Sequence, residues 1–360
     1  MEVIMKEFKL KSFDGTEIAC YLWDEVKKPI GIVQIAHGMG EHCPRYDHFA
    51  TYLNNNGYIV IADDHRGHGK TCGYDNRGIV EGDSFGDTIS DMIHLTAYAK
   101  EKYKLPLLLL GHSYGSFLSQ GYIQKNGANI AGVVLSGSAY MNIPLTKIGK
   151  AIAMIQAYLF GNDKPAKLIG KMSFGAYDKP FAAEKQAFAW LSRDPEVSKK
   201  YIADPFCGAR FAMSLGFQVS FFKGLGKIYT LDGLNAIPKT LPVLIVSGDK
   251  DPVGADGKLV TRLYEEYKTL GLAKTEFKLY PEARHEILNE TNKEEVYSDI
   301  LSFINKVFDV KPVEAVEKKV DKPAKAAKEQ KVEEAPKEVE VEVVAPQAVE
   351  AEIPEEKAAE

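Results

Sequence analysis

Residues 107–115 read LLLLGHSYG, and this stretch decides the expected fold. Four consecutive leucines followed by glycine are typical of a short strand that is buried on both faces of a sheet. The next residues, 116–124 (SFLSQGYIQ), can form a helix. A buried strand that leads directly into a helix is the repeating unit of a parallel sheet covered by helices.

The turn between this strand and helix carries the pattern G-x-S-x-G, formed by Gly111, Ser113 and Gly115. A serine on so sharp a turn takes a strained backbone conformation, and its hydroxyl is pushed out above the sheet. Glycines are expected on both sides because a Cβ there would collide with the neighbouring strand or helix. The pattern alone is weak, since an ordinary strand-to-helix turn can contain it, but its setting favours a serine nucleophile.

The alternation of strands and helices extends to both sides of residues 107–115. Strands are expected at 7–11, 17–23, 30–36, 58–62, 107–110, 132–135, 241–247 and 275–280. Amphipathic spacing predicts helices at 45–55, 84–103, 116–124, 258–270 and 293–307. The fold class is therefore α/β, with a mostly parallel eight-stranded sheet and helices on both faces.

Residues 138–239 interrupt this alternation. Ile148, Ile152, Ile155 and Leu159 share one helical face, and no convincing buried strand appears. Five phenylalanines gather in one segment: Phe206, Phe211, Phe217, Phe221 and Phe222. We expect a helical cap on the sheet, whose apolar side chains pack on one another and wall a pocket for an apolar ligand.

The composition changes after residue 310. Residues 311–360 hold 9 lysines and 14 acidic residues but no aromatic residue, so we expect a disordered acidic tail rich in Lys, Glu, Ala and Pro. The other 36 basic and 36 acidic residues balance, which argues against nucleic-acid binding. We expect one α/β domain at 1–310, with its core at 1–137 and 240–310 and a cap at about 138–239. The sequence identifies no partner for the tail.

Other features bear on the compartment and on cofactors. The cysteines are scattered and the N-terminus lacks a secretory pattern, so we expect a cytoplasmic protein with reduced thiols. No apolar run approaches the roughly 20 residues of a membrane span.

His65 and His68 form an H-x-x-H pair without a supporting cluster, and no phosphate-binding or dinucleotide-binding glycine pattern is present. We expect no metal and no cofactor.

A serine nucleophile needs a histidine base, which a carboxylate orients. On a strand-turn-helix elbow the chain order is serine, acid, histidine. Seven of the eight histidines precede Ser113, and only His285 follows it, just after the last expected strand. The acid is expected after the strand at 241–247, where Asp249 and Asp251 both qualify. Asp251 is favoured because Pro252 holds it in an extended conformation.

The oxyanion of a tetrahedral intermediate needs two backbone N–H donors. One candidate is the N–H of Tyr114, directly after the serine. The other is the N–H of Met39, in the glycine-rich HGMG segment that follows the strand at 30–36. An ordinary tight turn is the alternative interpretation of that segment.

Five motifs together resemble the α/β-hydrolase superfamily, specifically the monoacylglycerol lipase and lysophospholipase group often labelled serine aminopeptidase S33. They are HGMGEHCPRY, DHRGHG, GHSYGS, SGDKDPVG and ARHEILNE, within residues 5–308. The resemblance implies Ser113 as nucleophile, Asp251 rather than Asp249 as acid and His285 as base. It also implies Met39 and Tyr114 as oxyanion donors.

Three further residues near these motifs are candidates for substrate binding. Glu41 and Arg45 match positions near the glycerol end of the substrate in monoglyceride lipases, and His112 directly precedes Ser113. A salt bridge that holds the loop is an equal alternative for Glu41 and Arg45. The elbow departs from the family pattern at Tyr114, where methionine is usual, and at Ser116, where glycine is usual.

The resemblance implies a serine hydrolase that cleaves a monoacylglycerol or lysophospholipid, with transient contact between its cap and a membrane or micelle. Three alternatives stay open. One is a proline-iminopeptidase-like aminopeptidase, and another is a thioesterase or acyltransferase with the same triad. The third is a binding protein without enzymatic activity on the same scaffold.

Overall fold

A single sheet of eight strands organises the structure. The computed structural model describes residues 4–141, 143–172, 174–208 and 211–310. The strand order is β1-β2-β4-β3-β5-β6-β7-β8; β1–β2 and β2–β4 pair antiparallel, and all pairs from β4 to β8 are parallel. The strands are β1 (Lys6–Lys11), β2 (Glu17–Trp23), β3 (Gly31–Ala36), β4 (Tyr58–Asp63), β5 (Leu107–His112), β6 (Gly132–Ser136), β7 (Val243–Gly248) and β8 (Thr275–Tyr280).

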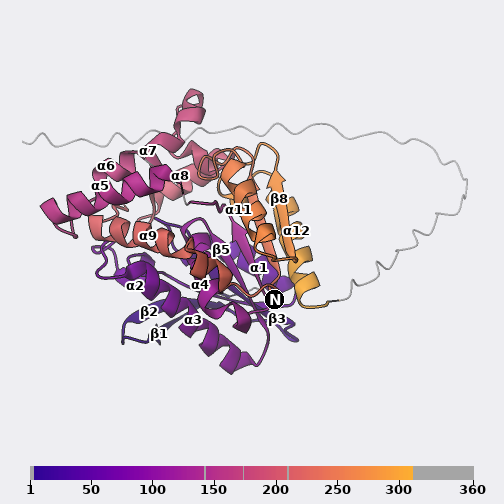
Figure 1. Cartoon of the computed structure of the whole chain (residues 1–360). Coiled ribbons are helices and arrows are strands. Elements are labelled where there is room, and N and C mark those ends of the chain that lie inside the picture. The colour runs from indigo at the N-terminus through magenta and orange to yellow at the C-terminus, as the bar shows by residue number, and fades with distance from the viewer. Residues whose placement is uncertain (1–3, 142, 173, 209–210, 311–360) are drawn as a thin grey trace, which may run out of the picture. The chain divides into compact units, whose positions relative to one another are not determined.

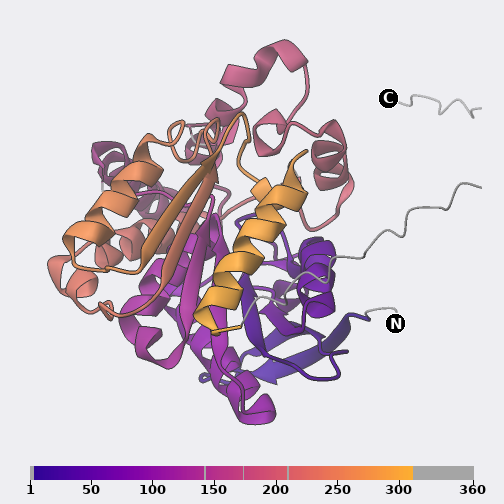
Figure 2. The ribbon, with the colours of Figure 1, turned by 90° about the vertical axis from the view of Figure 1, so that its right-hand side faces the viewer.

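Helices cover both faces of this sheet. Apolar side chains of α1 (Asp47–Asn55) and α12 (Lys293–Val307) pack on one face, where α12 is the yellow helix that lies along the sheet in Figure 2. The other face is covered by α3 (Ser84–Tyr103), α4 (Tyr114–Asn126) and α11 (Lys258–Thr269). Within β5, Leu107 and Leu109 belong to one core and Leu108 and Leu110 to the other. Burial on both faces explains the continuous run of leucines.

The segment between β6 and β7 is helical in its described part. It contains α5 (Pro144–Phe160), α6 (Lys167–Met172), α7 (Phe174–Tyr177), α8 (Pro195–Ala203), α9 (Leu215–Ile228) and α10 (Leu231–Asn235). Short 3-10 turns lie at Lys179–Glu184 and Ala189–Leu191. Figure 1 shows α5 to α9 grouped on one side of the folded unit. The expected helical cap is therefore present.

The remaining elements are short. They are 3-10 turns at Cys43–Tyr46, Gly127–Asn129 and Ile287–Asn289, and the single helical turn α2 (Gly69–Cys72). None of the described helices is both long enough and apolar enough to cross a membrane.

The fold class predicted from the sequence is confirmed, and two helix boundaries are corrected. The helix expected at 45–55 is a 3-10 turn up to Tyr46 followed by α1, because the N–H groups of Arg45 and Asp47 donate to carbonyls three residues earlier, those of His42 and Pro44. Helix α4 begins at Tyr114 instead of 116, since the Ser113 carbonyl already accepts the N–H groups of Ser116 and Phe117. The division into core and cap domains stays a prediction, and the expected disordered tail, 311–360, lies outside the described residues.

Gly248, the last residue of β7, allows a close approach of two loops. A Cβ at this position would lie 1.9 Å from the carbonyl oxygen of Ala283 and 2.4 Å from that of Arg284. Because these are backbone atoms, they cannot move aside without shifting the whole loop after β8. The glycine therefore brings the loops after β7 and β8 into contact.

We predict that Gly248→Ala lowers the free energy of unfolding by about 1–3 kcal/mol through overpacking. The matched control is Gly226→Ala in α9, where an added Cβ would have no neighbour within 4 Å. This control should raise stability by up to about 1 kcal/mol through helix propensity. Urea unfolding of both variants is the measurement, and wild-type stability of Gly248→Ala would contradict the prediction.

Candidate active site

Ser113 stands on a strained turn between β5 and α4. Its φ is +53° and its ψ is −117°, a conformation that residues other than glycine rarely adopt. The Ser113 N–H donates to the carbonyl of Ser136 on the neighbouring strand β6 at 2.9 Å. The end of the sheet therefore fixes the serine at the start of α4.

The two glycines of the motif are required by close packing. A Cβ on Gly115 would lie 2.1 Å from the carbonyl oxygen of Ala36 at the end of β3. A Cβ on Gly111 would lie 2.3 Å from the Ser119 hydroxyl and 2.4 Å from the Gly115 carbonyl oxygen. The expected collision with strand and helix is confirmed.

Three side chains from three loops form a chain of hydrogen bonds. His285 Nε2 lies 2.8 Å from Ser113 Oγ, and His285 Nδ1 lies 2.9 Å from Asp251 Oδ2. The Asp251 carboxylate also accepts hydrogen bonds from the Ser247 hydroxyl and the Val253 N–H, both at 2.9 Å. Because the carboxylate can only accept, Nδ1 carries the imidazole proton and Nε2 faces the serine as an acceptor.

Of the two aspartates weighed from the sequence, Asp251 contacts the histidine. Asp249 instead accepts the Glu282 N–H at 2.7 Å, across the neighbouring turn after β8. Asp249 therefore stabilises the loop, while the fully buried Asp251 orients the imidazole.

Burial and charge act in opposite directions on this pair. Burial alone would lower the pKa of His285, but the charge and hydrogen bond of Asp251 outweigh it and raise that pKa above its usual value. Burial would raise the pKa of Asp251, yet its partner His285 and its hydrogen bonds keep that pKa low. The aspartate is therefore ionised, and the imidazole holds a proton more readily than a free histidine does.

A cavity of about 320 Å³ opens beside Ser113. Met39 and Tyr114, the two candidate oxyanion donors, both lie in its wall. The helical cap supplies further lining side chains, which include Ile152, Ile169, Met172, Phe221, Phe222 and Leu225. The described lining contains no Asp, Glu, Lys or Arg. This wall is suited to an apolar ligand.

The five phenylalanines of the cap segment lie at different places in the structure. Phe221 and Phe222 line the cavity at Ser113, and Phe211 lines a second cavity of about 200 Å³, which Met39 also lines. Phe217 is buried in the core, and Phe206 packs against His42. The expected aromatic wall is thus formed by part of the segment.

The side chain of Tyr114 is almost fully buried. Its ring is 2% exposed and packs against the rings of Phe217 and Phe221, with centroids 5.4 and 5.6 Å away. Burial raises the pKa of its phenol, so the hydroxyl stays protonated. The side chain therefore contributes mainly ring surface to the cavity.

Glu41 and Arg45 form a buried network with Glu286. Arg45 donates to both oxygens of Glu286, at 2.8 and 2.7 Å, and it also contacts Glu41. The other oxygen of Glu41 accepts the Gly38 N–H at 2.6 Å and the Tyr46 hydroxyl at 2.7 Å. This is the salt bridge that was the alternative interpretation, and substrate contact by either residue stays a prediction.

His112 lies behind the histidine base candidate. Its ring centroid is 4.9 Å from that of His285, and Nδ1 lies 3.3 Å from the Ser136 hydroxyl. Burial, followed by the charge of His285, lowers the pKa of His112 to about 4, so the ring is neutral near pH 7. His112 lines neither of the two cavities that Met39 lines. Contact between His112 and a substrate therefore stays a prediction.

Two residues at the site were missed by the sequence analysis. Glu286 pairs with a residue 241 positions away, and no periodic signal connects the two. Trp190 lies on the 3-10 turn of the cap, its ring centroid 4.9 Å from that of His285, and its carbonyl accepts the His285 N–H at 3.3 Å. Glu286 could have been noticed as an acid directly after the histidine, whereas Trp190 gave no signal.

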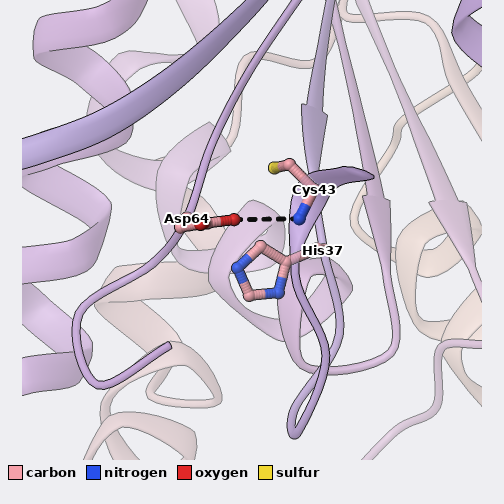
Figure 3. A group of neighbouring side chains, drawn as sticks. All are labelled: His37, Cys43 and Asp64. Atoms are coloured by element: carbon pink, nitrogen blue, oxygen red, sulfur yellow. Dashed lines mark hydrogen bonds between the residues drawn. The ribbon is translucent and has the colours of Figure 1, made fainter. Parts of the chain in front are cut away.

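Figure 3 shows a buried group of possible metal ligands, His37, Cys43 and Asp64. Their atoms already have partners. His37 Nε2 accepts the His65 N–H at 3.0 Å, and Asp64 accepts the Cys43 N–H at 2.9 Å and the Tyr21 hydroxyl at 2.8 Å. Burial raises the pKa of the Cys43 thiol well above its usual range, which keeps it protonated. A metal would have to displace these hydrogen bonds.

The H-x-x-H pair belongs to the same buried region. The ring centroids of His65 and His68 lie 4.1 and 5.1 Å from that of His37. His65 Nδ1 lies 2.8 Å from an Asp63 oxygen, and His68 Nδ1 lies 3.0 Å from the carbonyl of Arg66. These contacts stabilise the loop after β4, and the absence of a metal stays a prediction.

The fold and the order of these side chains along the chain define the class of protein. In α/β-hydrolases a serine elbow follows a strand of a mostly parallel sheet, and the acid and the histidine come later in the chain. This chain has that sheet and that order, so it is an α/β-hydrolase. A family model described as "Serine aminopeptidase, S33" matches residues 27–292, and the chain belongs to that family.

Known proteins of similar sequence and structure agree with this assignment. The chain is 30% identical to the monoacylglycerol lipase of Mycolicibacterium smegmatis over 302 residues, 83% of this chain and 96% of that protein. It is 27% identical to the monoglyceride lipase of Rattus norvegicus over 294 residues, 79% and 88% of the two chains. A crystallised carboxyl esterase from Bacillus coagulans in complex with glycerol is 29% identical, with a TM-score of 0.78 over 85% of this chain and 100% of that one.

We predict that Arg45→Met lowers the free energy of unfolding by about 3–5 kcal/mol at pH 7, because two buried carboxylates lose their shared cation. The deficit should shrink at lower pH. Arg45 offsets the effect of burial and holds the pKa of Glu286 at about 2. Without Arg45 the buried carboxyls would take up protons more readily than in the unfolded chain, so acid would favour the folded variant.

Chemical unfolding at several pH values tests this prediction. The matched control is Lys199→Met, which breaks a surface pair with Glu196 whose side chains are 65% and 58% exposed. It should change stability by less than about 0.5 kcal/mol. An Arg45→Met deficit that is absent at pH 7, or that grows as the pH falls, would contradict the role given to the network.

Proposed function

We propose that this chain is a serine carboxylic-ester hydrolase that cleaves a single-chain lipid ester, a monoacylglycerol or a lysophospholipid. The observation that carries the proposal is the chain of hydrogen bonds from Asp251 through His285 to Ser113, in the wall of an apolar cavity. The similar proteins named as monoacylglycerol and monoglyceride lipases support the choice of substrate.

In the proposed reaction, Nε2 of His285 accepts the Ser113 proton while Oγ attacks the ester carbonyl. The buried charge of Asp251 stabilises the imidazolium that forms. This imidazolium then gives its proton to the departing alkoxide, which leaves an acyl-enzyme. Water, activated by the same imidazole, releases the fatty acid and restores the serine.

The N–H groups of Met39 and Tyr114 would bind the oxyanion of each tetrahedral intermediate. Two observations support this assignment. Both residues line the cavity with Ser113, and a Cβ on Gly38 would lie 3.2 Å from Ser113 Cβ, so the loop after β3 runs close to the nucleophile. Glu41 binds the Gly38 N–H and so would fix the peptide that precedes the Met39 donor.

The lining of the cavity favours an ester with an apolar acyl chain over a peptide with a free N-terminus. An aminopeptidase needs a carboxylate for the substrate amine, and the described lining has none. A screen of monoacylglycerols, lysophospholipids, short thioesters and a prolyl-naphthylamide separates the remaining candidates. Release of proline would favour the peptidase, and absence of labelling by a fluorophosphonate would favour a binding protein.

We predict that Ser113→Ala lowers kcat on p-nitrophenyl butyrate by at least about 10³-fold, because the variant lacks the hydroxyl that His285 Nε2 contacts. Ser90→Ala is the matched control, since the Ser90 hydroxyl donates to the Gly86 carbonyl within α3. The control should retain wild-type turnover. Near-wild-type activity of Ser113→Ala, with an unchanged melting temperature, would refute the assignment.

The rate should also depend on the charge state of His285. A base must be neutral to accept a proton, so kcat/KM should fall as the pH drops through the pKa of His285, which lies above its usual value. Asp251→Asn should move this limb to lower pH, because the charge that raises the pKa is removed. It should also reduce kcat by about 10⁴-fold. A limb that stays in place in Asp251→Asn would contradict the proposed pairing.

A further inference from the structure

Three side chains of different chemistry gather where the cap meets the loop after β3. His42 lies in that loop, and Asp204 and Cys207 follow α8 in the cap. An imidazole nitrogen, a carboxylate oxygen and the thiol sulfur of this group lie within 4.8 Å of one another. Nitrogen, oxygen and sulfur donors of these kinds are the ligands that Zn²⁺ takes in proteins.

The turn that carries Asp204 and Cys207 is held by its own hydrogen bonds. The Cys207 N–H donates to the Asp204 carbonyl at 3.2 Å, and the Phe206 N–H donates to Asp204 Oδ1 at 2.8 Å. The other carboxylate oxygen, Oδ2, lies 2.8 Å from His42 Nε2. One oxygen is therefore fixed by the backbone while the second points at the imidazole, as is common for carboxylates that bind metals.

The donors of this group are little engaged elsewhere. Among the residues that the structure describes, His42 Nε2 and Asp204 Oδ2 have only each other as hydrogen-bond partners, and Cys207 Sγ has none. In the group of Figure 3, by contrast, the Cys43 thiol donates to a backbone carbonyl at 2.8 Å, and the Asp64 carboxylate accepts two N–H groups and one hydroxyl. A metal at His42 would displace a single hydrogen bond, and both partners of that bond would become ligands.

The charge around the sulfur also favours a cation. Burial raises the pKa of the Cys207 thiol, and Arg45 opposes this effect. The carboxylates of Asp204, Glu41 and Glu286 raise that pKa further. Three carboxylates and one guanidinium therefore act on the sulfur, and a divalent cation would offset their surplus of negative charge.

From the donor set, its geometry and the surrounding charge, we infer that His42, Asp204 and Cys207 bind a zinc ion. At ordinary zinc–ligand distances the donor atoms of a tetrahedral site lie about 3.4–3.6 Å apart, so shifts of about 1 Å suffice. The thiol would release its proton to solvent as the thiolate binds, and His42 would carry its proton on Nδ1. The side chains of His42 and Asp204 are 12% and 24% exposed, so water can reach the fourth position.

The ion would join the cap to the loop of a candidate oxyanion donor. His42 follows Met39 by three residues, and Gly208, next to Cys207, lines the second cavity together with Met39. The zinc site is independent of the proposed function, because its ligands lie outside the hydrogen-bonded chain at Ser113. The sequence-based expectation of no metal could not include this group, since 162 positions separate His42 from Asp204.

Cobalt(II) serves as a coloured probe of the site. The full chain, freed of metal by a chelator, should show a thiolate-to-cobalt charge-transfer absorption when Co²⁺ is added, and Zn²⁺ should abolish it. Cys207→Ser should lose this absorption, because the sulfur ligand is removed. The matched control is Cys72→Ser, whose thiol contacts the carbonyls of Gly69 and Gly73, and it should keep the absorption. An absorption that persists in Cys207→Ser would overturn the inference.

Competition with a chromophoric chelator measures the affinity for zinc. Asp204→Asn and His42→Gln should each weaken zinc binding by at least about 100-fold, and they keep the inference testable if Cys207→Ser fails to fold. The matched controls are Asp163→Asn and His94→Gln, at exposed positions, which should bind like wild type. Wild-type affinity in both site variants, or no binding by the wild-type chain at micromolar zinc, would overturn the inference.

Thermal unfolding separates this site from the candidate active site. Zinc should raise the melting temperature of the wild-type chain and of His285→Gln alike by several degrees, and it should leave that of Cys207→Ser unchanged. A shift that is lost in His285→Gln and kept in Cys207→Ser would place the ion at the candidate active site and overturn the inference. Zinc binding without turnover of any ester would refute the proposed function and leave the zinc site supported.

Discussion

The left-handed backbone of Ser113 is the constraint on which the site depends. A conformation of this kind costs about 1–3 kcal/mol and persists only where the surroundings enforce it. Here they do so by close packing: Gly115 lies against the end of β3, and Gly111 lies against α4. The sheet thereby presents one hydroxyl in the wall of the apolar cavity, where the loops after β3 and β8 approach it.

Those loops are held together by a second set of interactions. Arg45 joins Glu41, in the loop after β3, to Glu286, directly after His285. One guanidinium thus ties the candidate oxyanion loop to the loop of the candidate base. Three buried charges in contact contribute little net stability compared with apolar packing, but they strongly disfavour other arrangements of the two loops. The cap joins the same assembly, because Arg284 binds Glu184 and the carbonyl of Ala189.

The sequence allowed the whole sheet to be predicted, because burial on both faces and breakers between elements leave a local pattern. It also allowed the geometry around Ser113 to be anticipated, since chain order left His285 as the one downstream histidine and Pro252 favoured Asp251. Glu286 and Trp190 could not be placed, because their partners lie far away in the chain and neither contact has a sequence period. The predicted start of α4, residue 116, was too late for a local reason: the carbonyl of Ser113 already accepts the N–H groups of Ser116 and Phe117.

The position of Trp190 has a consequence for observing the protein at work. The chain has two tryptophans, and the other, Trp23, is fully buried in β2 with its indole N–H donating to Asp47. Trp190 packs on the imidazole of His285, and an indole face attracts that ring more strongly when it is charged. The fluorescence of one indole therefore offers an intrinsic optical signal of the protonation of His285, without any added label.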